Sequence, residues 1–244
     1  MVNFNNRATL LFMNIKGIIF DYGGTIDSRG VHWSEIIWDG YCAHNVNISK
    51  ETFREAYVYA ERELARVRHI LPGDNFHILL RKKIDIQLNW LAENKDLSVD
   101  ISTLAPQIAR FCYDHARQCV NEARPVLEAL AAKYPLQLVS NFYGNVDEVL
   151  RDFDIRRYFQ GIIESAVVGV RKPDARIFML GVVALGLKPQ EVLVVGDSLK
   201  KDILPAISIG CETAWIKGKG WTPDEDAATH PSLIPNLNTL LTTL

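Results

Sequence analysis

The sequence is poor in the features that mark several classes of protein. It has only four cysteines among 244 residues, and they form no Cys-x-x-Cys pair and no cluster with histidine. This argues against a zinc site or a disulfide framework. Cys42, Cys112, Cys119 and Cys211 are expected to be buried thiols in a reducing cytoplasm. The net charge of −2 lacks the positive excess that favours binding to nucleic acids or membrane surfaces, so we expect neither partner.

Long hydrophobic runs are also missing. No apolar stretch approaches the roughly 18 residues from which a membrane-spanning helix is inferred. Residues 8–13 are apolar but shorter than the core of a signal peptide, and no small-residue cleavage site follows them. Because Met13 stands just before the first predicted strand, we expect residues 1–12 to be a dispensable extension. With 48% apolar residues, the chain has the composition of an ordinary globular protein.

Apolar runs of strand length alternate with helical patterns over most of the chain. This alternation predicts a doubly wound parallel α/β sheet of the Rossmann-like type. A helix is expected to begin at Pro125, because proline suits a first turn. The predicted strands are 16–20, 136–139, 161–163, 191–195 and 212–216, and the predicted helices are 125–133, 145–153, 175–185 and 202–209.

Residues 28–122 differ, because they contain helical patterns and no convincing strand. We therefore expect an all-helical domain over 28–122, inserted into an α/β core formed by residues 1–27 and 123–244. The charged stretch from Glu61 to Arg68 is interpreted as a solvated helix face. The helices expected in the insertion are 33–44, 50–68, 75–94 and 101–120.

Residues that could take part in catalysis or ligand binding follow four of the predicted strands. Because the carboxyl ends of parallel strands meet at one edge of a sheet, these loops should converge. Taken singly, most of these residues would be interpreted as caps or surface positions, but their joint occurrence points to a site. They are Asp21, Gly23, Gly24 and Thr25 after the first strand, Ser140 and Asn141 after the second, Lys172 after the third, and Asp197 and Asp202 after the fourth.

The predicted convergence has a chemical consequence. Several carboxylates in one crevice repel each other and raise each other's pKa unless a cation neutralises them. Mg²⁺ suits such oxygen ligands. A lysine, a hydroxyl and the free backbone N–H groups of Gly24 and Thr25 could hold an anionic group. The pattern therefore predicts a magnesium-assisted phosphate site in which Asp21 is the nucleophile.

Along its whole length, the chain resembles the haloacid dehalogenase superfamily. Residues 20–25, 139–141, 171–174 and 195–202 are similar to its four sequence motifs, in order. The resemblance implies that Asp21 attacks phosphorus and forms an aspartyl phosphate that water then hydrolyses. It also implies that Ser140 contacts the transferring group and that Lys172 stabilises its charge. Residues 28–122 would then be a cap domain.

The resemblance further implies a magnesium site. Its ligands would be Asp21, the backbone carbonyl of Gly23 and Asp197. Asp202, the second metal-binding acid of the fourth motif, would orient Lys172 or a metal-bound water.

One position departs from the pattern of the superfamily's phosphatases. Gly23 stands where those enzymes carry an aspartate that protonates the leaving alkoxide. The enzyme could use substrates that need little acid help, or recruit an acid from the cap, for which His32 is a candidate. Alternatively, it could release halide as a haloacid dehalogenase, or bind phosphorylated ligands with little turnover.

Phosphonate hydrolysis is a further alternative, in which a cap lysine forms a Schiff base. Lys50, Lys82 and Lys83 lie in the insertion, but we interpret them as exposed helix lysines. The acidic pair Asp197 and Asp202 favours a metal, and hence phosphoryl chemistry. We therefore predict a magnesium-dependent, cytoplasmic phosphohydrolase of small phosphorylated metabolites, whose substrate and oligomeric state stay open.

Overall fold

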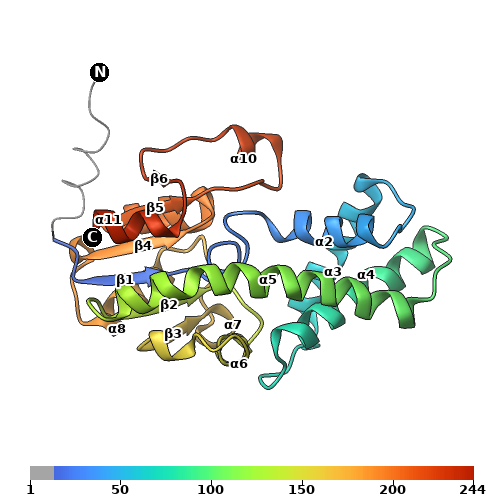
Figure 1. Cartoon of the computed structure of the whole chain (residues 1–244), viewed down its shortest axis with the longest axis horizontal. Coiled ribbons are helices and arrows are strands. Elements are labelled where there is room, and N and C mark those ends of the chain that lie inside the picture. Colours follow the sequence, from blue (N-terminus) through green and yellow to red (C-terminus); the bar gives the residue numbers. More distant parts are fainter. Residues whose placement is uncertain (1–13) are drawn as a thin grey trace.

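A computed structural model describes residues 14–244, in which six parallel strands form one sheet of order β3-β2-β1-β4-β5-β6 (Figure 1). From β1, the chain adds β2 and β3 on one side, and it then adds β4, β5 and β6 on the other side. The predicted doubly wound α/β sheet is confirmed. The strands are β1 (Gly17–Phe20), β2 (Leu136–Ser140), β3 (Gly161–Glu164), β4 (Val192–Gly196), β5 (Glu212–Ile216) and β6 (Leu233–Ile234).

The central strands are buried on both faces, which explains their continuous apolar sequences. All four residues of β1 and all five of β4 are buried. The register sets Phe20 of β1 beside Leu138 of β2 and Val195 of β4. The three strands therefore end at nearly the same level, so the loops that follow them begin side by side.

Helices cover both faces of the sheet. On one face, Ile19, Val139 and Val194 pack with α8 (Arg176–Leu185) and α9 (Leu204–Ser208). On the other, Phe20 and Val195 pack with α5 (Ile101–Ala131), α6 (Val146–Asp152) and α11 (Leu240–Thr243). The shorter elements are α7 (Ser165–Val168), α10 (Pro223–Ala227), the 3₁₀ turns η1 (Arg156–Tyr158), η2 (Pro189–Glu191) and η4 (Leu237–Thr239), and a π-helical turn, η3 (Leu199–Ile203).

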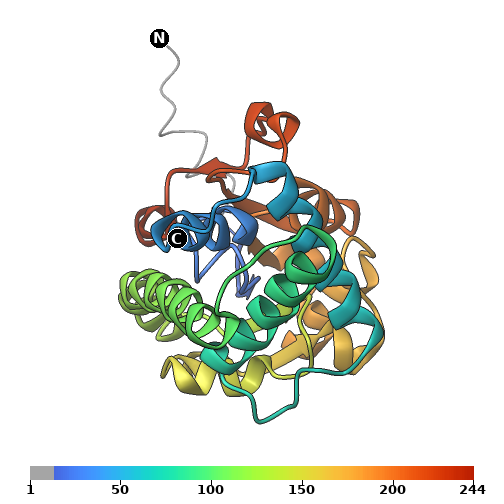
Figure 2. The same ribbon diagram turned by 90° about the vertical axis from the view of Figure 1, so that its right-hand side faces the viewer.

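Three helices lie beyond the carboxyl edge of the sheet (Figures 1 and 2). They are α2 (Trp33–Ala43), α3 (Lys50–Arg66) and α4 (Phe76–Asn94). Two of them, α2 and α4, pack against α5, and the third, α3, packs against α4 and α2. Side chains at their N-caps, His32, Ser49 and Asn75, accept hydrogen bonds from backbone N–H groups of the first turn, which fixes where each helix begins. The helices predicted in this region are confirmed, with small shifts at their ends.

Helix α5 corrects the sequence-based expectation. The predicted break between residues 120 and 125 is wrong, because one helix of 31 residues runs from Ile101 to Ala131 with Pro125 inside it. Its buried side, which includes Cys112, Val120 and Leu127, continues through the proline. Packing along this side offsets the hydrogen bond that proline cannot donate. The expected domain boundary at 122/123 falls within this helix, and the division into two domains stays a prediction.

Smaller differences have local causes. The predicted helix 202–209 is instead the η3 turn followed by α9, and β6 was missed because it has only two residues. Cys112, Cys119 and Cys211 are buried as predicted, whereas Cys42 is exposed. None of the helices in residues 14–244 combines the length and apolar character needed to cross a membrane. The proposed extension, residues 1–12, lies outside the described part of the chain.

Candidate active site

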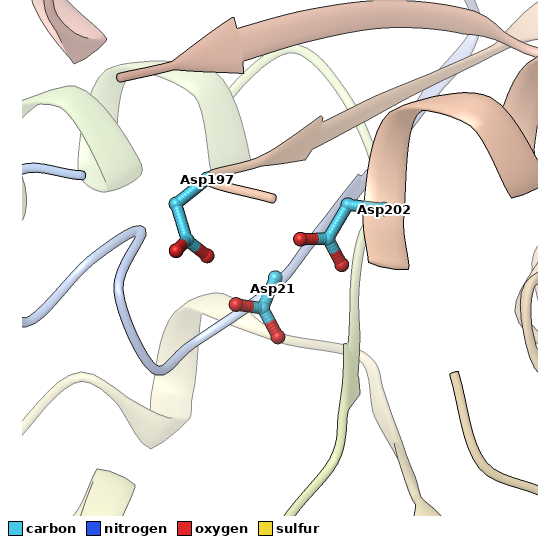
Figure 3. Close-up of side chains that lie close together, drawn as sticks. All are labelled: Asp21, Asp197 and Asp202. Atoms are coloured by element: carbon cyan, nitrogen blue, oxygen red, sulfur yellow. The ribbon is translucent and has the colours of Figure 1, made fainter. Parts of the chain in front are cut away.

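Three carboxylates meet at the carboxyl edge of the sheet. Asp21 follows β1, Asp197 follows β4, and Asp202 lies in the η3 turn. Each offers one oxygen within 4.8 Å of the other two, and the side chains face one another (Figure 3). Enclosure, together with the charges of Asp202 and Asp21, raises the pKa of Asp197 well above its ordinary value. The cluster therefore carries a repulsion that a bound divalent metal could relieve.

Lys172 supplies the positive charge beside this cluster. Its Nζ donates to Oδ1 of Asp21 at 2.6 Å and to Oδ1 of Asp202 at 2.7 Å, and its side chain is buried. Although burial opposes the charged form, the two carboxylates raise the pKa of Lys172. The ammonium is thus held charged against Asp21. The second oxygen of Asp202 accepts from the N–H of Ser198 at 3.0 Å, which fixes the carboxylate.

Asn141 orients the backbone of Lys172. Its Oδ1 accepts from the N–H of Lys172 at 2.9 Å, and its Nδ2 donates to the carbonyl of Lys172 at 3.1 Å. Both ends of the amide are used in this way. Asn141 therefore acts on the site through Lys172, and direct phosphate binding by its side chain stays a prediction.

Two hydroxyl groups orient the carboxylate of Asp21. Ser140 Oγ donates to Asp21 Oδ1 at 3.1 Å. Thr25 Oγ1 lies 3.2 Å from Asp21 Oδ2 and 3.3 Å from Asp197 Oδ1, so it bridges the two acids. The five polar side chains predicted around Asp21, namely those of Thr25, Ser140, Lys172, Asp197 and Asp202, are brought together in the structure.

The backbone groups differ from the prediction. Gly24 donates its N–H to Asp27 Oδ1 at 2.7 Å, and Thr25 donates to the carbonyl of Tyr22 at 3.2 Å. The expectation that these two N–H groups are free is therefore wrong. Within residues 14–244, the N–H groups of Tyr22 and Gly23 donate no hydrogen bond, and the carbonyl of Gly23 accepts none. This loop thus offers two donors suited to an anion and one oxygen suited to a cation.

Asp27 is a buried acid that sequence reasoning missed. Its Oδ1 takes the Gly24 hydrogen bond, and its Oδ2 accepts from Trp33 Nε1 at 3.0 Å. Burial raises the pKa of Asp27 to about 8, although these hydrogen bonds oppose the shift. Asp27 therefore ties the loop after β1 to the first turn of α2. A lone aspartate within a turn carries no sequence pattern that would have marked it.

A cavity of about 530 Å³ extends from Asp21 toward α3 and α4. Lys83 of α4 and Glu61 of α3 line this cavity. The prediction that Lys83 is an exposed helix lysine is therefore wrong, because its side chain is only 7% exposed. Glu61 is also not on a fully solvated face, because its side chain is 32% exposed and borders the cavity. Lys50 and Lys82 keep a third of their side-chain surface exposed, at 33% each.

His32 also lines the cavity, but it is held without charge. Its Nδ1 accepts from the N–H of Ser34 at 3.2 Å, which leaves the ring proton on Nε2. Burial, with help from Lys201 and Lys83, lowers the pKa of His32 to about 4. At neutral pH the imidazole therefore lacks the extra proton that a general acid would deliver. This argues against the candidate role of His32 as the missing acid.

The substitution Gly24→Ala is expected to damage the acidic cluster. A Cβ at Gly24 would lie 2.3–2.6 Å from the carboxylate atoms of Asp197, which must then move. We expect divalent-metal affinity to fall roughly 10- to 100-fold, measured from the metal-induced rise in melting temperature. Gly144→Ala is a matched control, because Gly144 has a similar φ of +96° but no neighbour within 4 Å. An equal loss of metal affinity in both variants would contradict the expectation.

The fold and the site together define a class of protein. A doubly wound sheet carries an acidic cluster and a charged lysine at the point where its strand order reverses, which is where such sheets bind ligands. A family model for haloacid dehalogenase-like hydrolases matches residues 15–210. The chain therefore belongs to the haloacid dehalogenase-like hydrolases.

Individual relatives have different activities in their names. A glyceraldehyde 3-phosphate phosphatase of Pyrococcus furiosus is 35% identical over 149 residues, which cover 59% of this chain and 56% of the phosphatase. An (S)-2-haloacid dehalogenase of Pseudomonas fluorescens is 24% identical over 226 residues, which cover 92% of this chain and 94% of that enzyme. The chain thus matches little more than half the length of the phosphatase but most of the dehalogenase.

A similarity in fold extends to solved structures. The magnesium-bound hydrolase YfnB of Bacillus subtilis aligns with a TM-score of 0.60 and 19% identity, covering 94% of this chain and 98% of that one. At this level of identity, the match supports the shared architecture alone.

Proposed function

We propose that this protein is a magnesium-dependent phosphohydrolase of small phosphorylated metabolites, with Asp21 as its nucleophile. The observation that carries the proposal is the cluster of three carboxylates around Asp21, of which Lys172 pairs with only two. Asp197 forms no ion pair with Lys172, and burial together with the charges of Asp202 and Asp21 raises the pKa of Asp197. A bound cation would complete the site, and this need favours phosphoryl transfer over metal-free dehalogenation.

The residues present fit such an ion. Asp21, Asp197 and the unpartnered carbonyl of Gly23 would hold it, because Mg²⁺ prefers oxygen ligands. Bound Mg²⁺ would offset the charge of the carboxylates and of the incoming phosphate. Asp202, already engaged by Lys172 and Ser198, would position Lys172, and its direct ligation of the metal stays a prediction.

The nucleophilic step follows from the residues around Asp21. A carboxylate oxygen of Asp21 attacks phosphorus, the bond from phosphorus to the leaving oxygen breaks, and an aspartyl phosphate remains. Ser140 and Lys172 donate hydrogen bonds that fix the direction of the carboxylate. As negative charge develops on the phosphoryl oxygens, the same donors can stabilise it. Water then cleaves the acyl phosphate and restores Asp21. The free N–H groups of Tyr22 and Gly23 are suited to hold the phosphoryl group.

The leaving group sets the limit of this mechanism. No acid stands at Gly23, and the uncharged His32 does not replace it. Substrates whose leaving group needs little protonation, such as acyl phosphates, should therefore react best. The same gap favours haloacid dehalogenation as a second candidate, since halide leaves without a proton, and the full-length Pseudomonas relative supports it.

The phosphonate alternative is weaker on the structure. A Schiff base requires an uncharged amine, but the pairing of Lys83 with Glu61 raises the pKa of Lys83 despite its burial. A phospholigand-binding role with little turnover is an outcome of the test below. The cytoplasmic location and the absence of nucleic-acid or membrane partners stay predictions from composition.

Chelation separates the two leading candidates. Acetyl phosphate, alkyl phosphates, phosphonoacetaldehyde and 2-haloacids are assayed with Mg²⁺ and with a chelator. We expect phosphate hydrolysis that requires Mg²⁺, and a rise in melting temperature that corresponds to about 2.7 kcal/mol of stabilisation when Mg²⁺ is at 100 times its Kd. Full turnover of 2-haloacids in chelator would overturn the proposal, and binding without turnover of any compound would support a ligand-binding role.

A further inference from the structure

The wall of the cavity formed by α3, α4 and the loop after β2 contains a linked group of three polar side chains, which we call the distal triad: Glu61, Lys83 and Tyr143. Lys83 Nζ contacts the carboxylate of Glu61 and lies 3.3 Å from Tyr143 Oη. Tyr143 Oη donates to Glu61 Oε2 at 3.0 Å. Glu61 comes from α3, Lys83 from α4, and Tyr143 from the loop after β2. The triad therefore joins α3 and α4 to the sheet.

The triad contains a full ion pair. Burial opposes ionisation of Glu61, yet Lys83 and the hydrogen bond from Tyr143 hold the pKa of Glu61 below its ordinary value. Glu61 in turn raises the pKa of Lys83. Both groups are therefore charged, and their net charge is zero. Because a buried ion pair seldom adds net stability, stability alone does not explain its place at the cavity wall.

The triad has hydrogen-bonding capacity to spare. The ammonium of Lys83 has three N–H donors, but within residues 14–244 only Glu61 and Tyr143 meet it as polar partners. Glu61 Oε1 has no partner beyond its contact with that ammonium. Because Glu61 Oε1 is itself buried, the groups left for a ligand are the spare donor of Lys83 and the partly exposed carboxylate side chain of Glu61, and both residues line the cavity.

The surroundings of the triad are aromatic. The ring centroid of Tyr57 lies 5.0 Å from Lys83 Nζ and 5.4 Å from the ring centroid of Trp221, and both rings line the cavity. Such faces suit the C–H surfaces of a substrate. A cavity of about 530 Å³ is also larger than a two- or three-carbon phosphate requires.

We propose that the distal triad is a specificity site for an uncharged, hydroxyl-bearing leaving group, that is, for a polyol or sugar phosphate. A hydroxyl can donate to Glu61 and accept from Lys83 without separating the two ions. A substrate carboxylate without a counter-charge would be repelled by the negative charge of Glu61. A substrate ammonium without a counter-charge would be repelled by the positive charge of Lys83. A zwitterion would have to break the existing pair. The inference rests on the proposed phosphohydrolase function and adds the class of substrate that the site recognises. It concerns selection among alkyl phosphates, all of which should turn over more slowly than an acyl phosphate because no acid stands at Gly23.

The test compares ribitol 5-phosphate with phosphoglycolate, which carries a carboxylate in the leaving group. The wild type should prefer ribitol 5-phosphate in kcat/KM. In Glu61→Gln the negative charge is removed and Lys83 is left unpaired, so the preference should fall roughly tenfold or more, mainly through KM. Glu55→Gln is the matched control, because Glu55 is an exposed residue of the same helix that pairs with Lys95 away from the cavity. Its preference should equal that of the wild type.

Tyr143→Phe is the second variant, in case Glu61→Gln does not fold. It removes only the hydroxyl that bridges the pair, and it should reduce the same preference severalfold. A wild-type preference for phosphoglycolate would overturn the inference. So would variants in which both substrates lose kcat/KM equally, because that result indicates a purely structural role.

Failure of the proposed function is distinguishable from failure of the inference. Acetyl phosphate has no polyol and reports whether the protein is a phosphohydrolase at all. If it is not turned over, the two ligands are compared by calorimetric titration of the wild-type protein with Mg²⁺ present. Tighter binding of ribitol 5-phosphate still supports the specificity site, whereas equal or tighter binding of phosphoglycolate overturns it.

Discussion

Replacing Asp21 with asparagine is expected to abolish turnover while leaving the fold intact. The side chains have the same shape, and an asparagine oxygen can still accept from Lys172 and Ser140, so the packing of the site is retained. The amide lacks the anionic oxygen that attacks phosphorus. Removal of a covalent nucleophile can cost on the order of 10⁶ in kcat. The measurement is the steady-state rate with acetyl phosphate, together with the melting temperature.

Asp39→Asn provides the control for this experiment. Asp39 is an exposed residue of α2 outside the cavity, so the same chemical change there should leave the rate unaltered. If Asp21→Asn keeps more than a few per cent of the wild-type rate, Asp21 is not the nucleophile. The carboxylate cluster would then have to act in another way, for example by activating water.

Gly23→Asp is expected to increase activity toward alkyl phosphates. A Cβ at Gly23 meets no atom within 4 Å, so the structure has room for the new side chain. The aspartate would stand two residues after Asp21 and could protonate the leaving alkoxide. A positioned general acid contributes roughly 10²–10⁴-fold, and we expect kcat toward an alkyl phosphate to rise within that range.

Acyl phosphates give an internal reference for this gain, since their leaving group needs little protonation. The ratio of alkyl phosphate to acetyl phosphate turnover should therefore rise in Gly23→Asp. Gly73→Asp places the same side chain in an open loop away from the site and should leave the ratio unchanged. If Gly23→Asp folds and hydrolyses acetyl phosphate but its ratio does not rise, the missing acid is not the limiting factor.

The parts of the site that sequence reasoning predicted are those fixed by local pattern and topology. Asp21, Ser140 and Asp197 each stand at the end of a buried apolar strand, and parallel pairing brings those ends to one edge. Their proximity therefore follows from the strands alone. Lys172 could be predicted for the same reason, although its loop runs from β3 at the edge of the sheet.

Other features depend on packing that one sequence does not reveal. Lys83 has the helical context of an exposed lysine, and its burial arises only because α3 and the loop after β2 meet α4 at that point. Which backbone N–H groups are free near Asp21 depends on the conformation of the turn after β1. That turn uses the N–H groups of Gly24 and Thr25 for its own hydrogen bonds. Pro125 has the sequence context of a helix start. The packing that allows α5 to continue past it involves segments distant in the sequence, which the local pattern does not reveal.

The continuity of α5 also limits how this protein can be recombined with its relatives. A helix transmits rotation, so one residue inserted near position 122 would turn everything on one side by about 100° relative to the other. The buried residues before that point, such as Val120, would then no longer share a side with Leu127 and Leu130. A chimera that exchanges residues 28–122 must therefore keep the helical phase across this junction. Length variation will be tolerated in the loops between α2, α3 and α4 before it is tolerated here.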